Sequence, residues 1–303
     1  MIYGFNLRIL LRKLASNSLN HFIKKEHSQM ADELFMKTEI HFTHANGIPA
    51  QSYQKFFTYF QDEFDLKSIP IIGMNPQYPI THDWRYLVDQ IIDDVEQQFQ
   101  GRKVVGLGHS FGSLLTLMSA YKRPDLFSQL VIMDPPFVIG SKSAMFEIAQ
   151  KLKLKAIDQF TPAGITLKRT DHWKDHAHAY TSMRHNQLFR HFDETCFQDF
   201  LNHGLQEDAE RGGLTLAVPK LVEAEIFRTV PAWWWRTPRK APAVPVHLIS
   251  ANKSPFYKQG FPQGIQKTYQ INYSLMQGGH MFPLEQPEKT AELVKHIIAQ
   301  QKK

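Results

Sequence analysis

An alternation of strand-like and helix-like segments between residues 38 and 134 constrains the fold of this chain more than any other feature. The strand-like segments are 38–45, 68–75, 103–107 and 129–134, and the helix-like segments are 52–64, 83–99 and 111–122. Strand–helix–strand repetition with short connections favours a parallel sheet with right-handed crossovers. The sequence therefore predicts the α/β fold class, a mostly parallel sheet flanked by helices.

The alternation stops after residue 136 and resumes only near residue 241. The intervening sequence is helical in character, polar and rich in histidine, and strands at 244–250 and 266–276 and a helix at 287–300 then close the chain. A long insertion between consecutive strands of a parallel sheet is typical of a lid or cap. We therefore expect three parts: an N-terminal extension of residues 1–37, a core of residues 38–136 and 241–303, and a helical cap of residues 137–240.

The net charge of +6 is concentrated near the N-terminus, where residues 1–29 carry five basic side chains and a single acid. The rest of the chain is nearly neutral and lacks a basic stripe with interleaved aromatic residues, so we expect no nucleic-acid partner. Residues 1–29 have amphipathic helical spacing and could contact an anionic membrane surface. They could also be a loosely packed extension, or precede a natural start at Met30.

Two further compositional features bear on the location of the protein. The sequence has no apolar run long enough to span a membrane, and we expect no firm membrane association. Its one cysteine, Cys196, excludes an intramolecular disulfide and fits a reducing compartment. We therefore expect a cytoplasmic protein, whose oligomeric state the sequence does not predict.

The segment GLGHSFG, residues 106–112, admits two mechanistic interpretations. Gly106, Gly108 and Gly112 open a helix after a strand, and Asp134 ends the next strand, as in a dinucleotide-binding turn. However, the third glycine comes one position late for that fingerprint. A strand–helix–strand–helix segment also precedes the turn, whereas the fingerprint normally opens its domain.

The second interpretation is a nucleophile elbow, because residues 108–112 match the pattern G-x-S-x-G around Ser110. A sharp strand-to-helix turn needs small residues two positions on either side of the nucleophile. The backbone N–H of Phe111 would then face a developing oxyanion at the helix N-terminus. The loop HANG, residues 44–47, would supply the second N–H, from Asn46 or, with a shift in register, from Gly47 or Ile48.

A nucleophilic serine needs a general base and an acid that orients the base. His280 lies in a glycine-flanked loop between the last strand and the last helix, where the base is expected. The loop after the strand at 244–250 contains no Asp or Glu, and Asn252 and Ser254 stand where an acid is usually found. Asp134, at the end of the strand next to the nucleophile strand, is therefore the candidate acid.

Together these motifs resemble those of the α/β-hydrolase superfamily over residues 38–303. They also occur along the chain in the same order as in that superfamily. HANG, GHSFG, DPPF and GGHMFPLEQP look most like a subgroup with its acid after the sixth strand, which includes fungal acyl-CoA hydrolases and a fungal peroxisomal lipase. The resemblance implies a Ser–His–Asp esterase, thioesterase or lipase with a helical cap. The chain departs from the superfamily in showing no clear strands before Thr38, and its C-terminus is not a peroxisomal one.

These motifs also suggest what the site binds. Residues beside the catalytic positions are candidates to bind a small ester or thioester with an apolar acyl group: His44, His109, Phe137, Met281 and Phe282. His172 and His176 have the spacing of metal ligands on a helix, but serine chemistry needs no metal, and we expect neither a metal nor a cofactor. A non-catalytic ligand-binding protein on a hydrolase scaffold remains the alternative function.

Overall fold

The computed structural model describes residues 37–152, 157–236, 240 and 242–301. The chain divides into two units, Met1–Thr38 and Glu39–Lys303, and the site discussed below lies in the second. Residues 1–36 lie outside the described residues. The expectations for the N-terminal extension, the start at Met30 and a membrane contact of residues 1–29 fall almost entirely within that range.

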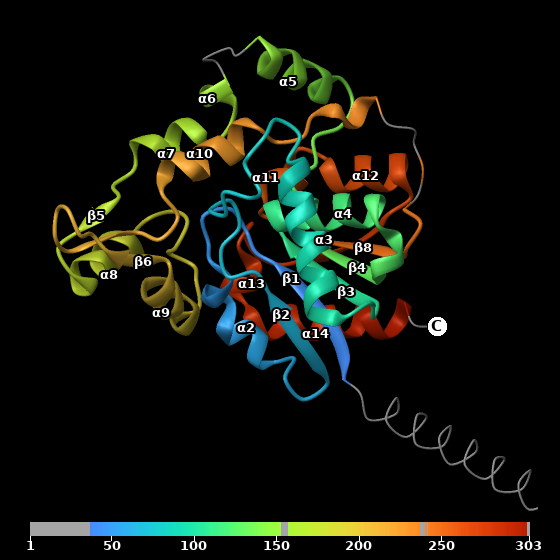
Figure 1. The fold of residues 1–303 in the computed structure, drawn as a ribbon, viewed down its shortest axis with the longest axis horizontal. Coiled ribbons are helices and arrows are strands. Elements are labelled where there is room, and N and C mark those ends of the chain that lie inside the picture. Colours follow the sequence, from blue (N-terminus) through green and yellow to red (C-terminus); the bar gives the residue numbers. More distant parts are fainter. Residues whose placement is uncertain (1–36, 153–156, 237–239, 241, 302–303) are drawn as a thin grey trace, which may run out of the picture. The chain divides into compact units, whose positions relative to one another are not determined.

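A six-stranded sheet in the order β2-β1-β3-β4-β8-β9 forms the centre of the second unit (Figure 1). Its strands are β1 (Thr38–Thr43), β2 (Phe64–Ser68), β3 (Val104–His109), β4 (Phe127–Met133), β8 (Val246–Ala251) and β9 (Asn272–Met276). The β1–β3, β3–β4, β4–β8 and β8–β9 pairings are all parallel. The predicted α/β class with a mostly parallel sheet is therefore confirmed.

The central strands β3 and β4 are buried on both faces, which explains their near-continuous apolar character. Successive side chains of β3 and β4 enter two different cores: Val105 and Val131 join one, and Val104 and Leu130 join the other. The first core also receives α2 (Gln54–Thr58) and α14 (Pro287–Gln301). The second receives α3 (Arg85–Phe99), α4 (Phe111–Lys122) and α12 (Phe261–Tyr269). The sheet therefore lies between two helical layers.

Two strand predictions are wrong in position. The segment 68–75 forms a loop except for Ser68, the last residue of β2. Pro70 cannot donate a ladder hydrogen bond, and Gly73 has a φ of +93°. The first part of 266–276 is helical, since Ile265 and Tyr269 lie one helical turn apart and are both buried. Only β9, its second part, joins the sheet.

The sequence had suggested a helical segment between β4 and β8, but the segment also contains strands. Its helices are α5 (Ser141–Lys151), α6 (Ile157–Phe160), α7 (Ala163–Lys168), α8 (His176–Arg184), α9 (Glu194–His203) and α10 (Lys220–Arg228). Three short strands, β5 (His172–Trp173), β6 (Leu205–Glu207) and β7 (Leu214–Leu216), form an antiparallel sheet of their own. His172 and His176 therefore do not share a helix.

The tryptophan triplet, residues 233–235, forms a short 3₁₀ turn, η3 (Trp233–Trp235), at the end of the inserted segment. The Trp234 ring is buried and lies 4.2 Å from the ring of Phe137 and 6.2 Å from that of Tyr269 on α12. This aromatic contact attaches the end of the insertion to the core. None of the helices in the described ranges combines the length and apolar character that crossing a membrane requires.

Candidate active site

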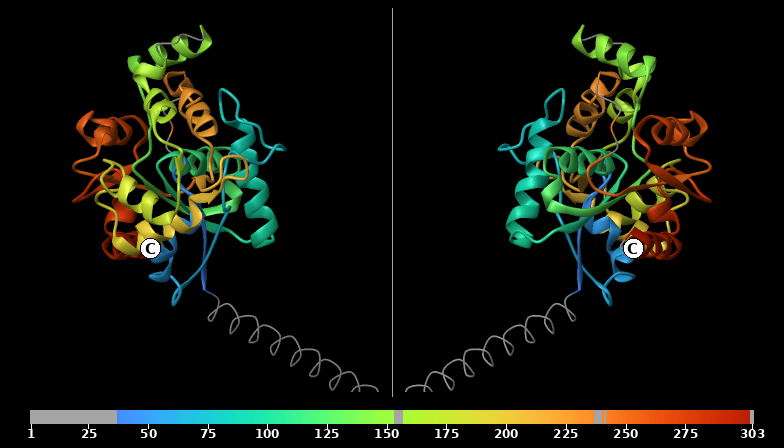
Figure 2. Two further views of the ribbon diagram at one scale, coloured as in Figure 1. Left: turned by 90° about the vertical axis from the view of Figure 1, so that its left-hand side faces the viewer. Right: turned by 90° about the vertical axis from the view of Figure 1, so that its right-hand side faces the viewer.

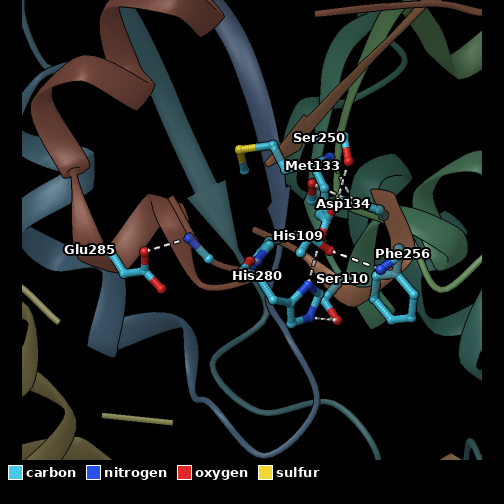
Figure 3. A network of polar contacts seen from close by, with 12 residues as sticks. His109, Ser110, Met133, Asp134, Ser250, Phe256, His280 and Glu285 are labelled. Carbon is cyan, nitrogen blue, oxygen red and sulfur yellow. Dashed lines mark hydrogen bonds and ion pairs between the residues drawn. The ribbon is translucent and has the colours of Figure 1, made fainter. Parts of the chain in front are cut away.

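Ser110 stands on a strained turn between β3 and α4, with φ 54° and ψ −118°. Its N–H donates a hydrogen bond to the Met133 carbonyl oxygen, 2.8 Å away (Figure 3). A Cβ on Gly108 would lie 2.7 Å from the backbone of Ser113, and one on Gly112 would overlap the Thr43 carbonyl. The glycines are thus required by close backbone approach. Protein backbone fills the space beside both glycines, so the structure lends no support to the dinucleotide interpretation.

Ser110, His280 and Asp134 come together at the carboxyl ends of the parallel strands (Figure 3). The distance between Ser110 Oγ and His280 Nε2 is 2.8 Å. His280 Nδ1 lies 2.6 Å from Asp134 Oδ2. With the Nδ1 proton donated to the carboxylate, Nε2 is free to accept the Ser110 proton.

Asp134 is held by more than its histidine. The residue is buried, has a φ of +48°, and its N–H donates to the Ile249 carbonyl oxygen 2.8 Å away. Ser250 Oγ donates to Asp134 Oδ1 at 2.7 Å, and Ser254 Oγ donates to Oδ2. Sequence analysis missed Ser250, and it named Ser254 only as standing where an acid is usually found. Their signal was a region without acids that carries two hydroxyl groups, Ser250 on β8 and Ser254 in the loop after it, which can hold a carboxylate supplied by the neighbouring strand.

The loop that carries His280 is fixed through its glycines. Gly279 N–H donates to Glu285 Oε2 at 2.8 Å, and the Glu285 carboxylate occupies the space that a Cβ on Gly279 would need (Figure 3). Gly278 has a φ of +141°, and its N–H donates to Asn252 Oδ1 at 3.1 Å. The glycines therefore allow the sharp approach of the loop, while Glu285 and Asn252 hold the backbone just before His280.

Two backbone N–H groups of residues near Ser110 are candidates to bind an anion. Phe111 is the first residue of α4, and Asn46 follows β1. Both residues line the same cavity as Ser110 and His280. Neither N–H donates a hydrogen bond to any residue that the structure describes. Helix N-termini and free N–H groups favour negative charge, so both groups suit a developing oxyanion.

His44 supports the HANG loop and does not contact the cavity, which corrects its expected substrate-binding role. The ring is buried, its Nε2 accepts the Ile72 N–H at 3.0 Å, and its Nδ1 donates to the Ala45 carbonyl oxygen at 2.8 Å. These partners require the neutral imidazole. Burial lowers the pKa of His44 to about 4, and the hydrogen bond to Ala45 only partly opposes this shift.

His109 is also buried away from the cavity, and it takes part in a chain of hydrogen bonds. Its Nε2 donates to the His280 carbonyl oxygen at 3.0 Å, and its Nδ1 accepts the Tyr53 hydroxyl proton at 2.7 Å. Tyr53 Oη in turn accepts the Ala45 N–H at 3.4 Å. This Ala45–Tyr53–His109–His280 chain links the HANG loop to the histidine loop. Burial first, and then the neighbouring His280 ring, lower the pKa of His109 to about 3.

The two buried histidines make the fold sensitive to acid. Both have folded-state pKa values below the usual 6.5, so the unfolded chain binds more protons between pH 6.5 and about 4, and stability falls as the pH falls. At pH 5 we expect each histidine to lower the free energy of unfolding by about 2 kcal/mol relative to pH 7.5. Urea unfolding at the two pH values measures this difference. Replacing His44 with glutamine should reduce it by about half, whereas replacing the exposed His82 should not; equal stability at both pH values contradicts the prediction.

A large cavity opens from the triad into the inserted segment. Its volume is about 1380 Å³, above the range of most small-molecule pockets, and Ser110, His280 and Met281 line one part of it. Aliphatic and aromatic side chains from α5, α7, α8, α9 and α10 line part of the rest, together with residues of the loops between these helices. Phe137 and Phe282 were expected to bind substrate but are buried in the two cores instead. Of the five candidate substrate-binding residues, only Met281 lines the cavity.

A buried ion pair connects the inserted segment to the HANG loop. The Glu223 carboxylate on α10 pairs with Arg169, accepts the Thr166 hydroxyl at 3.2 Å, and lies against Gly47. Asn46 Nδ2 donates to the Glu223 carbonyl oxygen at 3.0 Å. Burial raises the pKa of the Glu223 carboxyl, and Arg169 opposes that shift. Glu223, which sequence analysis did not single out, thus holds with Arg169 the loop that carries Asn46.

Comparison with known proteins agrees with this architecture. Residues 70–293 match the sequence model described as the alpha/beta hydrolase family. The chain belongs to the alpha/beta hydrolase family. No curated protein sequence matches this hydrolase.

Solved structures share the fold of this hydrolase at low sequence identity. An E-2-(acetamidomethylene)succinate hydrolase is 16% identical, with a TM-score of 0.66 over 87% of this chain and 91% of its own. The thioesterase domain from the curacin biosynthetic pathway is 16% identical, with a TM-score of 0.66 over 85% and 91%. A peroxisomal α/β-hydrolase of Saccharomyces cerevisiae is 15% identical, with a TM-score of 0.64 over 87% and 78%. Similarity at these identities shows a common fold.

Proposed function

We propose that this protein is a serine hydrolase that cleaves carboxylic esters or thioesters through an acyl-enzyme on Ser110. One observation carries the proposal. The Ser110 hydroxyl, the His280 ring and the Asp134 carboxylate form a continuous hydrogen-bonded series, with distances of 2.8 and 2.6 Å, at the wall of a largely apolar cavity. A nucleophile, a base and a group that orients the base in this arrangement suit acyl transfer.

In the first half-reaction, Ser110 Oγ attacks the acyl carbonyl carbon while His280 Nε2 takes the hydroxyl proton. The N–H groups of Phe111 and Asn46 bind the oxyanion of the tetrahedral intermediate. As the intermediate collapses, the bond to the leaving group breaks, and His280 donates its proton to the departing alcohol or thiol. In the second half-reaction, a water molecule gives a proton to His280 and attacks the acyl-enzyme. This attack forms a second tetrahedral intermediate. When that intermediate collapses, the bond to Ser110 Oγ breaks, the carboxylic acid is released and His280 returns the proton to Ser110.

Asp134 holds the tautomer that these steps need. Its Oδ2 accepts the Nδ1 proton of His280, so that Nε2 faces Ser110 unprotonated, and the carboxylate stabilises the imidazolium formed during attack. The two serine hydroxyls on Asp134 orient the carboxylate. The apolar lining of the cavity supports an apolar acyl group as substrate.

A fluorophosphonate probe tests the proposal directly, since it reacts only with an activated serine. We expect intact-mass and peptide analysis to find one adduct, on Ser110, and none in the Ser110→Ala variant. A panel of p-nitrophenyl esters and acyl thioesters of increasing chain length then measures which acyl groups are turned over. Folded protein that forms no adduct would contradict the proposal and favour a non-catalytic ligand-binding protein.

Tyr53 is predicted to act as a positioning residue in this reaction. Replacing Tyr53 with phenylalanine removes the hydroxyl that joins Ala45 N–H to His109 Nδ1, which leaves the HANG and histidine loops less well aligned. We expect kcat to fall roughly tenfold, because small misplacements of reacting groups are costly. KM should change little, since Tyr53 is buried outside the cavity lining. Steady-state kinetics with one ester measures both.

Tyr78→Phe is the matched control, because the Tyr78 hydroxyl also makes a hydrogen bond, 2.6 Å long, but to Asp93 on the surface. It should leave both constants unchanged. An unaltered kcat in Tyr53→Phe, or an effect on KM alone, would show that the hydrogen-bond chain does not position the catalytic groups.

A further inference from the structure

Helix α5 buries polar side chains and exposes apolar ones, the reverse of an ordinary surface helix. It buries its polar residues Ser143, Glu147 and Gln150, with exposed fractions of 0%, 2% and 9%. It exposes Met145 and Ile148, with fractions of 70% and 57%, and Leu152, the residue after its last turn, is 65% exposed. Figure 2 shows α5 at the outer end of the inserted segment in both views. Water therefore meets the apolar face of this helix.

Specific polar contacts hold the helix in this orientation. Ser143 Oγ donates to the Ala232 carbonyl oxygen at 2.6 Å, and Gln150 Nε2 donates to the Val230 carbonyl oxygen at 2.9 Å. The Glu147 carboxylate pairs with Arg236 at 2.6 Å. Buried polar groups are costly to leave unpaired, so rotating the helix to bury its apolar face would break these contacts. The outward apolar face is thus built into the fold.

Helix α7 repeats the arrangement beside the same cavity. Ile165 is 76% exposed, while the next residue, Thr166, is buried and bonded to Glu223. The described large hydrophobic residues that are more than half exposed all belong to the inserted segment: Met145, Ile148, Leu152, Ile165 and, on α10, Leu221. Met145, Ile148 and Ile165 also line the cavity. The exposed apolar surface and the cavity that reaches Ser110 are therefore continuous.

The exposed charges on α5 and α7 have one sign, and the neighbouring acids Asp158 on α6 and Glu225 on α10 pair with Arg228. Lys142 and Lys151 on α5 and Lys168 on α7 are exposed, and Lys151 also pairs with Glu147 at 3.0 Å. The one acid of α5, Glu147, is buried, and α7 contains none. Exposed aliphatic side chains framed by lysines match the interface of an anionic membrane, where apolar groups enter the acyl region and lysines meet headgroup phosphates.

We propose that this lid face docks on an anionic lipid surface. We define the lid face as the set Met145, Ile148, Leu152, Ile165, Lys142, Lys151 and Lys168. Docking buries the exposed aliphatic side chains and places the cavity entrance against the lipid, so that an apolar substrate enters the cavity from the membrane.

Vesicle flotation with the full chain tests this proposal without reference to catalysis. We expect the protein to float with vesicles of phosphatidylcholine and phosphatidylserine, and binding to weaken with added salt. Leu152→Asp and Ile165→Asp should each weaken binding by at least about tenfold. Leu275→Asp is the control, because Leu275 is an exposed leucine on β9, outside the lid face. It should bind like the unaltered protein.

Circular dichroism melting establishes that each variant is folded, and the second lid-face variant keeps the test valid should one of them unfold. Undiminished binding by the folded Leu152→Asp and Ile165→Asp variants would overturn the proposal, since other residues, such as the basic segment 1–29, would then carry the interaction. Absence of binding by the unaltered protein would also overturn it. Equal binding to vesicles of phosphatidylcholine alone would overturn the assignment of an anionic surface.

Discussion

Replacing Ser110 with alanine is expected to lower kcat for ester hydrolysis by roughly 10⁴- to 10⁶-fold. The variant lacks the oxygen that lies 2.8 Å from His280 Nε2, so no acyl-enzyme can form. The free N–H groups of Phe111 and Asn46 and the cavity remain, and they would support a small residual rate through binding alone. KM should change little, because Ser110 contributes little to the apolar lining.

Burst and steady-state measurements with a p-nitrophenyl ester check this expectation. The matched control is Ser128→Ala, which removes the hydroxyl of an exposed serine on β4 that donates to the Val104 carbonyl oxygen at 3.1 Å. It should retain full activity. A Ser110→Ala protein that keeps kcat within about tenfold of the unaltered value would rule out the acyl-enzyme on this residue.

Replacing Asp134 with asparagine should reduce kcat by roughly 10⁴-fold while the fold is kept. Asparagine has almost the same shape, but its amide can present an N–H group to His280 Nδ1. The imidazole would then hold its proton on Nε2, where it can no longer accept the Ser110 proton. Labelling of Ser110 by a fluorophosphonate should slow in parallel, because the serine is no longer activated.

Asp125→Asn is the matched control, since Asp125 is an exposed aspartate that pairs with Arg123 at 2.6 Å. Its removal should leave kcat unchanged. If Asp134→Asn hydrolysed esters at the normal rate, another group would have to orient His280, and the assignment of the acid would be wrong.

The positions of Ser110 and His280 could be predicted because each depends on local constraints. The glycines around Ser110 are demanded by a turn of a few residues, and the glycines before His280 by a loop that approaches Glu285. Asp134 was predicted as the acid because the loop after β8 contains no Asp or Glu. That reasoning could not reveal that Ser250 and Ser254, from this same region, donate hydrogen bonds to the Asp134 carboxylate.

Proximity in sequence was a poor guide to the substrate cavity. His109 and Phe282 each flank a residue of the cavity wall, yet both side chains point into the protein interior. Consecutive residues of a strand or a turn project in different directions, so a neighbour in sequence often faces away from the site. The inserted segment was harder still to predict, because β5 pairs with β7, far along the chain, and no local pattern reveals that contact.

The sequence by itself determined the α/β class and the three residues that carry the proposed chemistry, because strand and helix periods and glycine-dependent turns are local properties. Only the tertiary structure decided how those residues are held and what they face. It joined Ala45, Tyr53, His109 and His280 through buried hydrogen bonds. It also turned the apolar side of α5 toward solvent, since the contacts of Ser143, Glu147 and Gln150 with residues far along the chain outweigh the usual burial of apolar groups.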